Sequence, residues 1–597
     1  MKSLKYLNKF IWKYKYRFLL GVLFVAISNI FGVLPAQVIR IAIDLVNDTI
    51  EIYKLYNGFE LQSELLSTFN LVLLFFGAAV LGLALARGIF LFMMRQTMIV
   101  MSRLIEYDLK NEIYDKLQNL STAFYKKSNT GDLMARASED VSRVRMYLGP
   151  ALMYTVNVAV LFVLVITTMI SVNAKLTFYV LIPLPILSIA IYFVTSIINE
   201  KSEKIQRQLS ILSTFAQETF SGIRILKAYV KEENSINRFD AECIKYKDRS
   251  LELARVQSLF FPLMIVLIGL STLLTVYVGG IEVINGNVTA GNIVEFVVYV
   301  NMLTWPVSAI GWVTSLVQRA AASQERINQI LMVTPELTNS TTTKRDDIQG
   351  AITFNNVSFT YPETGIVALN NVSFKVNAGQ SLAIIGRTGC GKSTIANLIT
   401  RMFDVADGEL LIDGKSIKKI DLNYYREQVG YVPQDVFLFS DTISNNIGFG
   451  INADVGIKTL VEAAKDAGIH QDIIAFRNGY ETRIGERGIT LSGGQKQRIS
   501  IARATVKSPK ILIFDDCLSA VDTKTEELIL NSLKRIMQDR TTIIIGHRIS
   551  SVRHAEKIIV LDKGAIIEEG DHESLIKDGG VYYKLYKLQL LEQELAT

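Results

Sequence analysis

The first half of the chain alternates long apolar runs with long polar segments. The apolar runs cover, approximately, residues 18–45, 70–94, 150–172, 176–198, 258–281 and 293–317. Each run is long enough to cross a bilayer, because a transmembrane helix needs roughly 20 apolar residues. The sequence therefore predicts a six-helix transmembrane domain over residues 18–325.

The polar connections between these runs differ in length and charge. Segments 95–145 and 199–255 are long and rich in Lys and Arg, whereas segment 48–67 carries mostly acidic side chains. Leu and Ile recur at helical spacing between residues 104 and 120, so the long segments extend the helices beyond the bilayer. Because Lys and Arg favour the cytoplasmic side, we expect both termini and both long segments there.

Several residues in this half have more than one interpretation. Residues 1–17 interleave lysines with apolar side chains, which predicts an amphipathic interfacial helix. Arg40 and Asp44 lie four residues apart, so they either pair on one helix face or serve a function. Charges inside a span are costly, and Arg87 is the better candidate for lining a polar path. Pro183 and Pro185 predict a kink in the fourth span.

The second half has the pattern of a soluble α/β domain. We expect a linker over residues 326–349, the domain over 350–585 and a tail over 586–597. The apolar run 381–385 predicts a buried strand, and the pattern over 394–399 predicts a helix. Between them lies a phosphate-binding P-loop pattern, with its flanks Gly386, Arg387, Thr388, Gly389, Cys390, Gly391, Lys392, Ser393 and Thr394. Its backbone N–H groups face phosphates, Lys392 adds a charge and Ser393 offers a hydroxyl to magnesium.

Further chemistry-bearing residues follow other predicted strands. Asp515 and Asp516 end the apolar run 511–514, and His547 follows the run 542–546. Gln434 lies in a loop after another strand. Because carboxyl ends of parallel strands share one sheet edge, these side chains are expected beside Lys392, with Asp515 as a hard oxygen ligand for magnesium.

Two more stretches fit a nucleotide site. Tyr361 precedes the P-loop and either stacks on adenine or is an ordinary strand-end tyrosine. Ser492, Gly493, Gly494 and Gln495 come just before a predicted helix over 497–504 and offer donors to an anion.

Composition narrows the class of protein. The 597 residues are half hydrophobic, and the mean hydropathy of +0.28 excludes a soluble ATPase once the apolar runs are considered. A net charge of +6 fits basic cytoplasmic loops and does not indicate a nucleic-acid partner. Three cysteines indicate no disulfide framework, and we expect no cleavable signal. Cys390 is either a reactive thiol or, as we favour, a small residue that fills the loop.

Six features follow one another along the chain: the P-loop, Gln434, Leu491 to Gln495, Asp515, the Ser519 to Asp522 stretch and His547. In that order the chain resembles an ABC exporter half-transporter, six spans fused to one nucleotide-binding domain, in a bacterial cell membrane. Phe124 to Leu133 and Gly222 to Arg224 resemble its intracellular loops, whose short helices dock on the ATPase.

The resemblance implies the roles of the site residues. ATP would lie between the P-loop of one chain and Ser492 to Gln495 of a second half-transporter. Tyr361 would stack on adenine, and Lys392 would bind the β- and γ-phosphates. Ser393, Gln434 and Asp515 would order Mg²⁺. His547 would contact the γ-phosphate, and Asp522 would communicate with the opposite site.

Asp516 departs from the family pattern, which has Glu as the general base at this position. Its carboxylate is one methylene shorter, so hydrolysis at this site is expected to be weak. The chain therefore resembles the degenerate-site subunit of a heterodimeric exporter, and we favour a heterodimer over a homodimer. The expected function is export of amphipathic drugs or lipids through the lipid membrane. The alternative is a regulatory subunit or nucleotide-gated channel with little transport.

Overall fold

The computed structural model of the chain describes residues 2–55, 58–59, 61–337, 339, 347–451, 456–485, 488, 491–517, 531–532 and 534–596. The chain forms two compact units. Met1–Gln118 and Gly131–Val333 make a helical unit. Asn119–Thr130 and Thr334–Thr597 make a sheet unit. The sheet unit therefore includes a short excursion from the first half of the chain as well as most of the second half.

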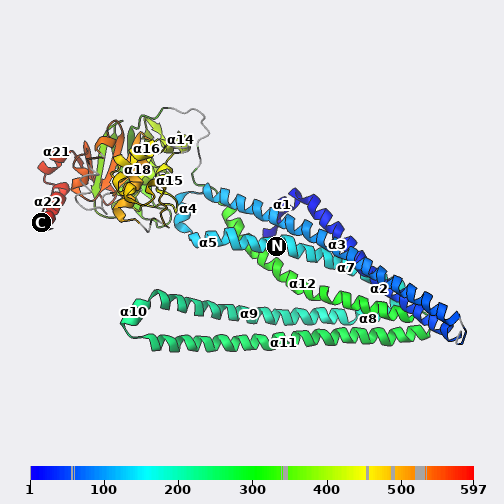
Figure 1. The fold of residues 1–597 in the computed structure, drawn as a ribbon. Coiled ribbons are helices and arrows are strands. Elements are labelled where there is room, and N and C mark those ends of the chain that lie inside the picture. Colours follow the sequence, from blue (N-terminus) through cyan, green and yellow to red (C-terminus); the bar gives the residue numbers. More distant parts are fainter. Residues whose placement is uncertain are drawn as a thin grey trace. The chain divides into compact units, whose positions relative to one another are not determined.

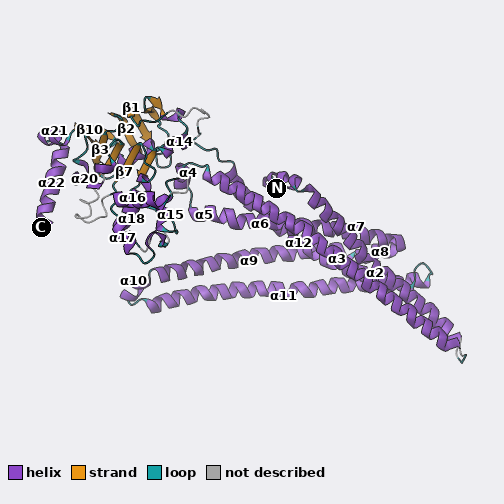
Figure 2. Cartoon of the chain, turned by 45° about the horizontal axis from the view of Figure 1, so that its top comes forward, coloured by secondary structure: helices purple, strands orange, loops and turns teal. Residues whose placement is uncertain are grey.

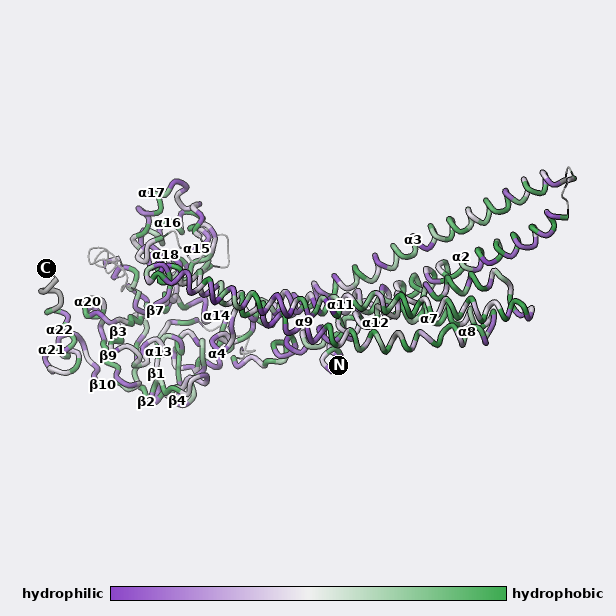
Figure 3. Tube along the Cα trace, turned by 90° about the horizontal axis from the view of Figure 1, so that it is seen from below, coloured by the Kyte–Doolittle hydropathy of each residue, from purple (hydrophilic) through white to green (hydrophobic). Residues whose placement is uncertain are grey.

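The helical unit begins with a 3₁₀ turn over Ser3–Leu7 and consists of helices throughout (Figure 1). Their bounds are α1 Asn8–Lys13, α2 Lys15–Leu55, α3 Leu61–Gln118, α5 Thr130–Ala135, α6 Val141–Met146, α7 Leu152–Val172, α8 Ala174–Leu181, α9 Pro183–Ser221, α10 Ile223–Ala228, α11 Glu232–Ile284 and α12 Ala290–Leu331. Among the described residues, six helical runs are long and apolar enough to cross a membrane. Hydrophobic positions follow one another along α7, α8 and α12 (Figure 3). The predicted number of spans is confirmed.

Local sequence explains where these helices bend or end. Pro183 has no backbone N–H, and it begins α9 two residues after α8 ends at Leu181. Ile182 between them keeps right-handed helical angles, φ −53° and ψ −42°, so Ala174–Ser221 is one helical run and the kink stays a prediction. Two π-helical turns, Arg136–Asp140 and Tyr147–Ala151, interrupt the helical run from α5 to α7. Such turns widen a helix by one residue per turn and occur frequently at functional sites.

Helices α9 and α11 run side by side and are joined at one end by α10 (Figures 1 and 2). Apolar side chains are exposed at this end: Ile225 is 68%, Tyr229 72% and Val230 81% exposed. We therefore treat these three side chains as a candidate interaction surface.

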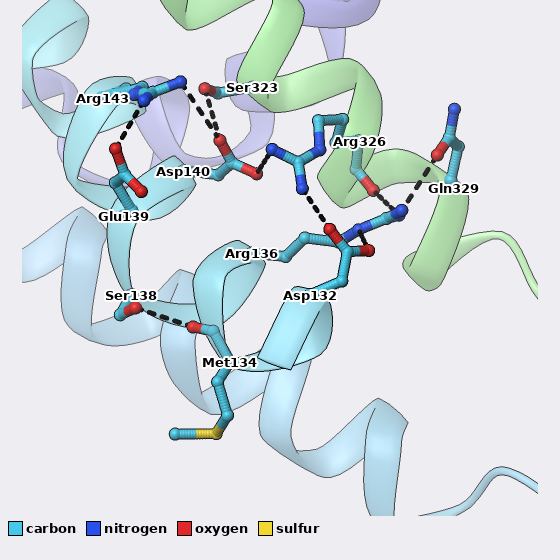
Figure 4. Close-up of polar contacts among 10 residues, drawn as sticks. All are labelled: Asp132, Met134, Arg136, Ser138, Glu139, Asp140, Arg143, Ser323, Arg326 and Gln329. Atoms are coloured by element: carbon cyan, nitrogen blue, oxygen red, sulfur yellow. Dashed lines mark hydrogen bonds and ion pairs between the residues drawn. The ribbon is translucent and has the colours of Figure 1, made fainter. Parts of the chain in front are cut away.

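A network of ion pairs joins the run from α5 to α6 with the end of α12 (Figure 4). Arg326 pairs with Asp140 at 3.1 Å and with Asp132 at 2.5 Å. Ser323 donates to Asp140 at 2.8 Å, and Arg136 donates to Asp132 at 2.8 Å and to the carbonyl of Arg326 at 2.9 Å. Asp140 is buried, so Arg326 and Ser323 compensate a charge that burial alone would make costly. We call these five residues the Arg326 network.

The sheet unit contains two sheets (Figure 2). Antiparallel strands β2, β1, β4 and β5 form the smaller sheet: β1 Ile352–Thr360, β2 Val367–Val376, β4 Asp407–Ile412 and β5 Lys415–Ser416. The larger sheet has the order β10-β9-β3-β8-β7-β6. Its strands are β3 Ser381–Gly386, β6 Val429–Val432, β7 Ile511–Asp515, β8 Thr541–Gly546, β9 Lys557–Asp562 and β10 Ala565–Gly570. The α/β fold class predicted for the second half is confirmed.

Helices cover these sheets and connect the strands. Their bounds are α4 Thr122–Lys127, α13 Lys392–Ile399, α14 Leu422–Glu427, α15 Ile443–Gly448, α16 Ile457–Asp466, α17 His470–Ala475, α18 Gly493–Thr505, α20 Ile549–Val552, α21 His572–Lys577 and α22 Val581–Ala596. The sheet unit also has 3₁₀ turns over Ile417–Lys419 and Gly479–Glu481.

The larger sheet has a hydrophobic core on each face. Ala383 and Ile385 of β3 belong to one core, whereas Leu382 and Ile384 belong to the other. Every residue of β3, β7 and β8 is buried, as expected for parallel strands covered on both sides. Because β3 pairs in parallel with β8, β8 with β7 and β7 with β6, the carboxyl ends of these four strands lie at one edge.

Candidate nucleotide-binding site

The P-loop joins the end of β3 to the start of α13 at this edge. Gly391 is the residue before α13 and has φ +103°, a conformation that favours glycine. A side chain there would approach the carbonyl of Ala368 to 2.3 Å, and one at Gly386 would approach the carbonyl of Leu561 to 2.2 Å. The two glycines are therefore required by the backbone itself. Arg387, Thr388 and Gly389 are exposed, whereas Cys390 is buried and burial raises the pKa of its thiol.

Lys392 turns back over the loop that contains it. Its ammonium donates to the carbonyl of Gly386 at 2.8 Å and to that of Arg387 at 2.9 Å. Burial lowers the pKa of Lys392 below its ordinary value, and the neighbouring carboxylates of Asp516 and Asp515 oppose this shift. The amino group is thus held against two carbonyls of the loop at the N-terminus of α13, the place where a P-loop binds phosphate.

Asp515 and Ser393 form the second part of the site. Ser393 Oγ donates to Asp515 Oδ1 at 3.1 Å. Asp515 is buried at the end of β7, and burial raises the pKa of its carboxyl, which the hydrogen bond from Ser393 opposes. A hydroxyl and a carboxylate side by side are hard oxygen ligands, so this pair fits Mg²⁺. Bound there, Mg²⁺ would neutralise charge on phosphate oxygens.

Asp516, Gln434 and His547 complete the edge. Asp516 adopts φ +47°, a left-handed conformation that Asp tolerates better than most residues. Its backbone N–H donates to the carbonyl of Ile545 at 2.9 Å. Gln434 Nε2 lies 3.5 Å from Asp516 Oδ2, at the long limit of a hydrogen bond. Burial lowers the pKa of His547, the charge of Lys392 lowers it further, and Asp516 opposes both. His547 thus lies within the electrostatic influence of both Lys392 and Asp516.

Tyr361 follows the end of β1 and is anchored at both ends of its side chain. Its hydroxyl lies 3.1 Å from the hydroxyl of Thr394 in α13. Its ring packs edge-on against Phe359 and Phe403, with centroids 5.0 and 5.6 Å away. Tyr361 is half-buried, so the ring is fixed beside the P-loop helix with part of its surface accessible.

The Ser492 to Gln495 stretch begins α18. Ser492 Oγ accepts from the backbone N–H of Gln495 at 3.3 Å, and Gln495 Oε1 accepts from that of Ser492 at 3.0 Å. This reciprocal capping fixes the first turn of the helix. Gln495 Nε2 also donates to Asp472 of α17 at 3.0 Å. Ser492 and Gly493 are exposed.

The structure therefore brings together one group of predicted site residues and separates another. Lys392, Ser393, Gln434, Asp515, Asp516 and His547 gather at the edge of the larger sheet. In the described part of the chain, the side chains of Ser492 and Gln495 bond to their own helix turn and to Asp472 instead of to the P-loop. Asp522 lies outside the described residues.

Two family models match the chain. The model of the ABC transporter transmembrane region matches residues 18–307, and that of the ABC transporter matches residues 369–519. The probable multidrug resistance ABC transporter ATP-binding/permease protein YheI of Bacillus subtilis is 38% identical over 82% of this chain and 84% of its own length. The chain belongs to the ABC transporter family.

Other relatives of this ABC transporter differ in their named cargo. The multidrug resistance-like ATP-binding protein MdlA of Buchnera aphidicola is 35% identical over 98% of this chain and 97% of its own length. The ATP-dependent lipid A-core flippase of Syntrophus aciditrophicus is 35% identical over 82% of this chain and 81% of its own. This ABC transporter is accordingly a multi-pass protein of a bacterial cell membrane, with an ATP-binding domain whose ATPase activity is coupled to transport.

Two residues of the sheet unit support the site although no sequence motif predicted this role for them. Asp472 of α17 accepts from Gln495 at 3.0 Å and from Arg498 at 2.8 Å, so it holds the start of α18 in place. Arg503 donates to the carbonyls of Asn446 and Phe437 at 2.8 and 2.9 Å, and burial lowers its pKa to about 10. Phe437 is three residues after Gln434, so Arg503 fixes the loop that carries this glutamine.

The charged residues Arg40, Asp44 and Arg87 within the spans contact residues of other helices, which their spacing in the sequence did not predict. Instead of pairing with Asp44, Arg40 lies 3.5 Å from the buried Glu295 of α12. Asp44 accepts from the backbone N–H of Gly291 at 2.9 Å, at the start of α12. Arg87 lies over Gly32, where a Cβ would meet its guanidinium at 3.2 Å. These contacts hold α2 against α12 and against α3.

Proposed function

We propose that this ABC transporter is one half of an ATP-driven exporter of amphipathic compounds, drugs or lipids, that works by alternating access. The observation that carries the proposal is the nucleotide site at the edge of the larger sheet, fused to six membrane-crossing helical runs. The names of YheI and of the lipid A-core flippase support drug or lipid cargo. Our orientation places both termini in the cytoplasm, where ATP is available.

We infer the roles of the site residues from the family resemblance, and some of the contacts described above support them. Lys392 binds the β- and γ-phosphates, Tyr361 stacks on adenine, and Ser393, Gln434 and Asp515 order Mg²⁺. His547 contacts the γ-phosphate. The contact between Ser393 and Asp515 supports a shared ligand, and the exposure of Ser492 and Gly493 supports their use on the nucleotide of a second half-transporter. Asp522 communicates with that opposite site.

A pocket in the helical unit supports amphipathic cargo. It has a volume of about 270 Å³ and lies between α9 and α12. Its wall combines apolar and uncharged polar side chains, among them Ile191, Tyr192, Asn199 and Gln318. A wall of this composition suits a ligand with an apolar body and few polar groups.

Asp516 sets the hydrolytic strength of this chain's own site. It occupies the position of the general base with a carboxylate one methylene shorter than the Glu typical of the family. A base must reach within about 2.6–3.2 Å of the proton that it accepts. We infer that the chain binds ATP firmly, hydrolyses it slowly, and pairs as a heterodimer with a half-transporter that has the competent site.

The exposed end around α10 supports the requirement for a second half. Ile225, Tyr229 and Val230 are exposed there. We infer that this end docks on the ATPase domain of the second half, so that closure of the two ATPase domains reaches α9 and α11.

Purification of the chain alone tests these inferences. We expect ATP binding with little hydrolysis, and we expect Asp516→Glu to raise the turnover rate by roughly 10²-fold, since a positioned base contributes about 10²–10⁴ in rate. Lys392→Ala is the control, because it removes the phosphate contact and lowers hydrolysis in both backgrounds. A stable homodimer that hydrolyses ATP and loses this activity in Asp516→Asn would overturn the heterodimer.

The alternative function, a regulatory subunit or nucleotide-gated channel, rests on Asp516 alone. Reconstitution in liposomes together with the second half separates the two. An exporter accumulates a lipid or a cationic dye on one side in an ATP-dependent manner, and cargo stimulates its ATPase. Passive flux that ATP gates without accumulation would favour the channel.

A further inference from the structure

Helix α4 is a short element from the first half of the chain that is built into the sheet unit. Ala123 is 1% exposed and belongs to the core beside β3. Thr122 Oγ1 lies 3.6 Å from the sulfur of Met402, and Ser121 Oγ lies 3.2 Å from Glu336. These contacts fix the first turn of α4 and determine where its last turn lies.

The last turn of α4 places Lys126 on the ring of Tyr361. The Lys126 ammonium is 4.4 Å from the centroid of Tyr361 and 4.9 Å from that of Phe403. The two rings are perpendicular, so the cation occupies the corner between them. A cation within about 6 Å of an aromatic face is attracted by the ring quadrupole.

Three neighbouring side chains hold Tyr361 in place. The buried rings of Phe359 and Phe403 pack edge-on against the ring of Tyr361, and its hydroxyl lies within hydrogen-bond distance of Thr394. Lys126 is exposed, so it approaches the ring from the accessible side. An adenine base needs the same side, because stacking requires an open aromatic face.

We propose that Lys126 is a displaceable cation that competes with adenine for the ring of Tyr361. The proposal rests on the proposed stacking role of Tyr361. ATP then binds at the expense of one contact between α4 and the ring. Since the chain passes from α3 into α4 and on into α5, base binding loosens the last turn of the element that connects these two helices.

The test is ATP binding to the full-length chain in nanodiscs, measured by displacement of a fluorescent ATP analogue. Lys126→Met keeps the length of the side chain but removes the charge. We expect ATP to bind about two- to fivefold more tightly, the range that an exposed cation–π contact corresponds to. Lys126→Arg retains a cation and is expected to stay near the parent affinity.

Two controls separate competition for the ring from a general change in charge. Lys127→Met removes the same charge from the next position of α4, where the side chain is also exposed, and should leave the affinity for ATP unchanged. Inorganic tripolyphosphate has no base, so its own dissociation constant, calculated with the affinity of the fluorescent analogue measured for each variant, should be equal in the parent and in Lys126→Met. Weaker or unchanged ATP binding in Lys126→Met would overturn the proposal, as would an equal gain for tripolyphosphate.

Tyr361→Ala distinguishes failure of this inference from failure of the proposed site. If Tyr361→Ala leaves the affinity for ATP unchanged, Tyr361 does not stack on adenine and both statements fall. If it weakens ATP binding while Lys126→Met has no effect, only the role of Lys126 falls. In the Tyr361→Ala background, Lys126→Met should bring no further gain.

Discussion

At the scale of single residues, burial makes the charged forms of two site residues less favourable. Lys392 and Asp515 are both buried, and burial moves their pKa values in opposite directions, toward the neutral form of each. A ligand that brings the complementary charges would stabilise the charged forms of both side chains in this poorly solvated loop. Triphosphate with Mg²⁺ is such a ligand, which is consistent with the proposed roles of Lys392 and Asp515.

The same reasoning gives a pH prediction for His547. Burial and the charge of Lys392 hold the pKa of His547 below the ordinary 6.5, so its imidazole is mainly neutral in the folded protein at pH 7. Because the unfolded chain takes up this proton first as pH falls below 6.5, His547 lowers stability in that range and has no such effect above it. Phosphate beside the ring should stabilise the imidazolium and raise the pKa.

NMR of histidine-labelled protein checks this prediction. The His547 resonance, identified by its loss in His547→Gln, should titrate below pH 6.5 without nucleotide and at higher pH with a nonhydrolysable ATP analogue. His554 is an internal comparison: burial also lowers its pKa, but it lies in the sheet unit outside the site and should not respond to nucleotide. A downward shift of the His547 midpoint with nucleotide would contradict the contact with phosphate.

At the scale of elements, the Arg326 network fixes how the run from α5 to α6 lies on α12. Residues 130 and 131 are one crossing of the chain between its two units, and residues 333 and 334 are another. Asp132 and Arg326 therefore join the two segments close to where each leaves the helical unit. This makes the network a mechanical connection between the two crossings.

We expect Arg326→Met to destabilise the helical unit by roughly 1–3 kcal/mol. It leaves the buried carboxylate of Asp140 with only the longer ion pair to Arg143, at 3.9 Å, and the exposure of Arg326 itself keeps the cost below that of a fully buried pair. Arg207→Met is the matched control, because Arg207 pairs with Glu203 at 2.6 Å on the exposed surface of one helix, where a pair contributes about 0.3–0.5 kcal/mol. Thermal unfolding in detergent measures both. Equal midpoints for the two variants would contradict a structural role for the network.

At the scale of the whole molecule, the exposed end around α10 is where a second half is expected to bind. Ile225 is 68% exposed, and a buried apolar anchor in an interface contributes roughly 2 kcal/mol or more. We expect Ile225→Asp to retain ATP binding but to lose cargo-stimulated ATPase and transport. Ile244→Asp is the control, since Ile244 is 46% exposed on α11, roughly three turns from the start of that helix. Transport in liposomes measures both, and equal transport by the two variants would contradict docking through α10.

Much of this architecture is predictable from local patterns. Six apolar runs indicate the spans, and the strand–loop–helix pattern around Lys392 indicates the P-loop, because these signals depend on residues that are neighbours in the chain. The gathering of Asp515, Asp516 and His547 also follows from sequence, since all three end strands of one parallel sheet. Arg40 and Asp44 show the limit of such patterns. Their spacing of four residues left open whether they pair with each other or serve a function, and in the structure each contacts α12 instead.

The sequence by itself determined the elements, the order of the motifs and the sheet edge at which they meet. Tertiary structure alone decided which distant side chains touch: Arg326 and Asp132, 194 residues apart, and Lys126 on the ring of Tyr361. The physical reason is that periodicity and turn chemistry act over a few residues. Contacts between distant residues depend instead on how whole helices and sheets pack, and on which buried charge or open ring face remains to be satisfied.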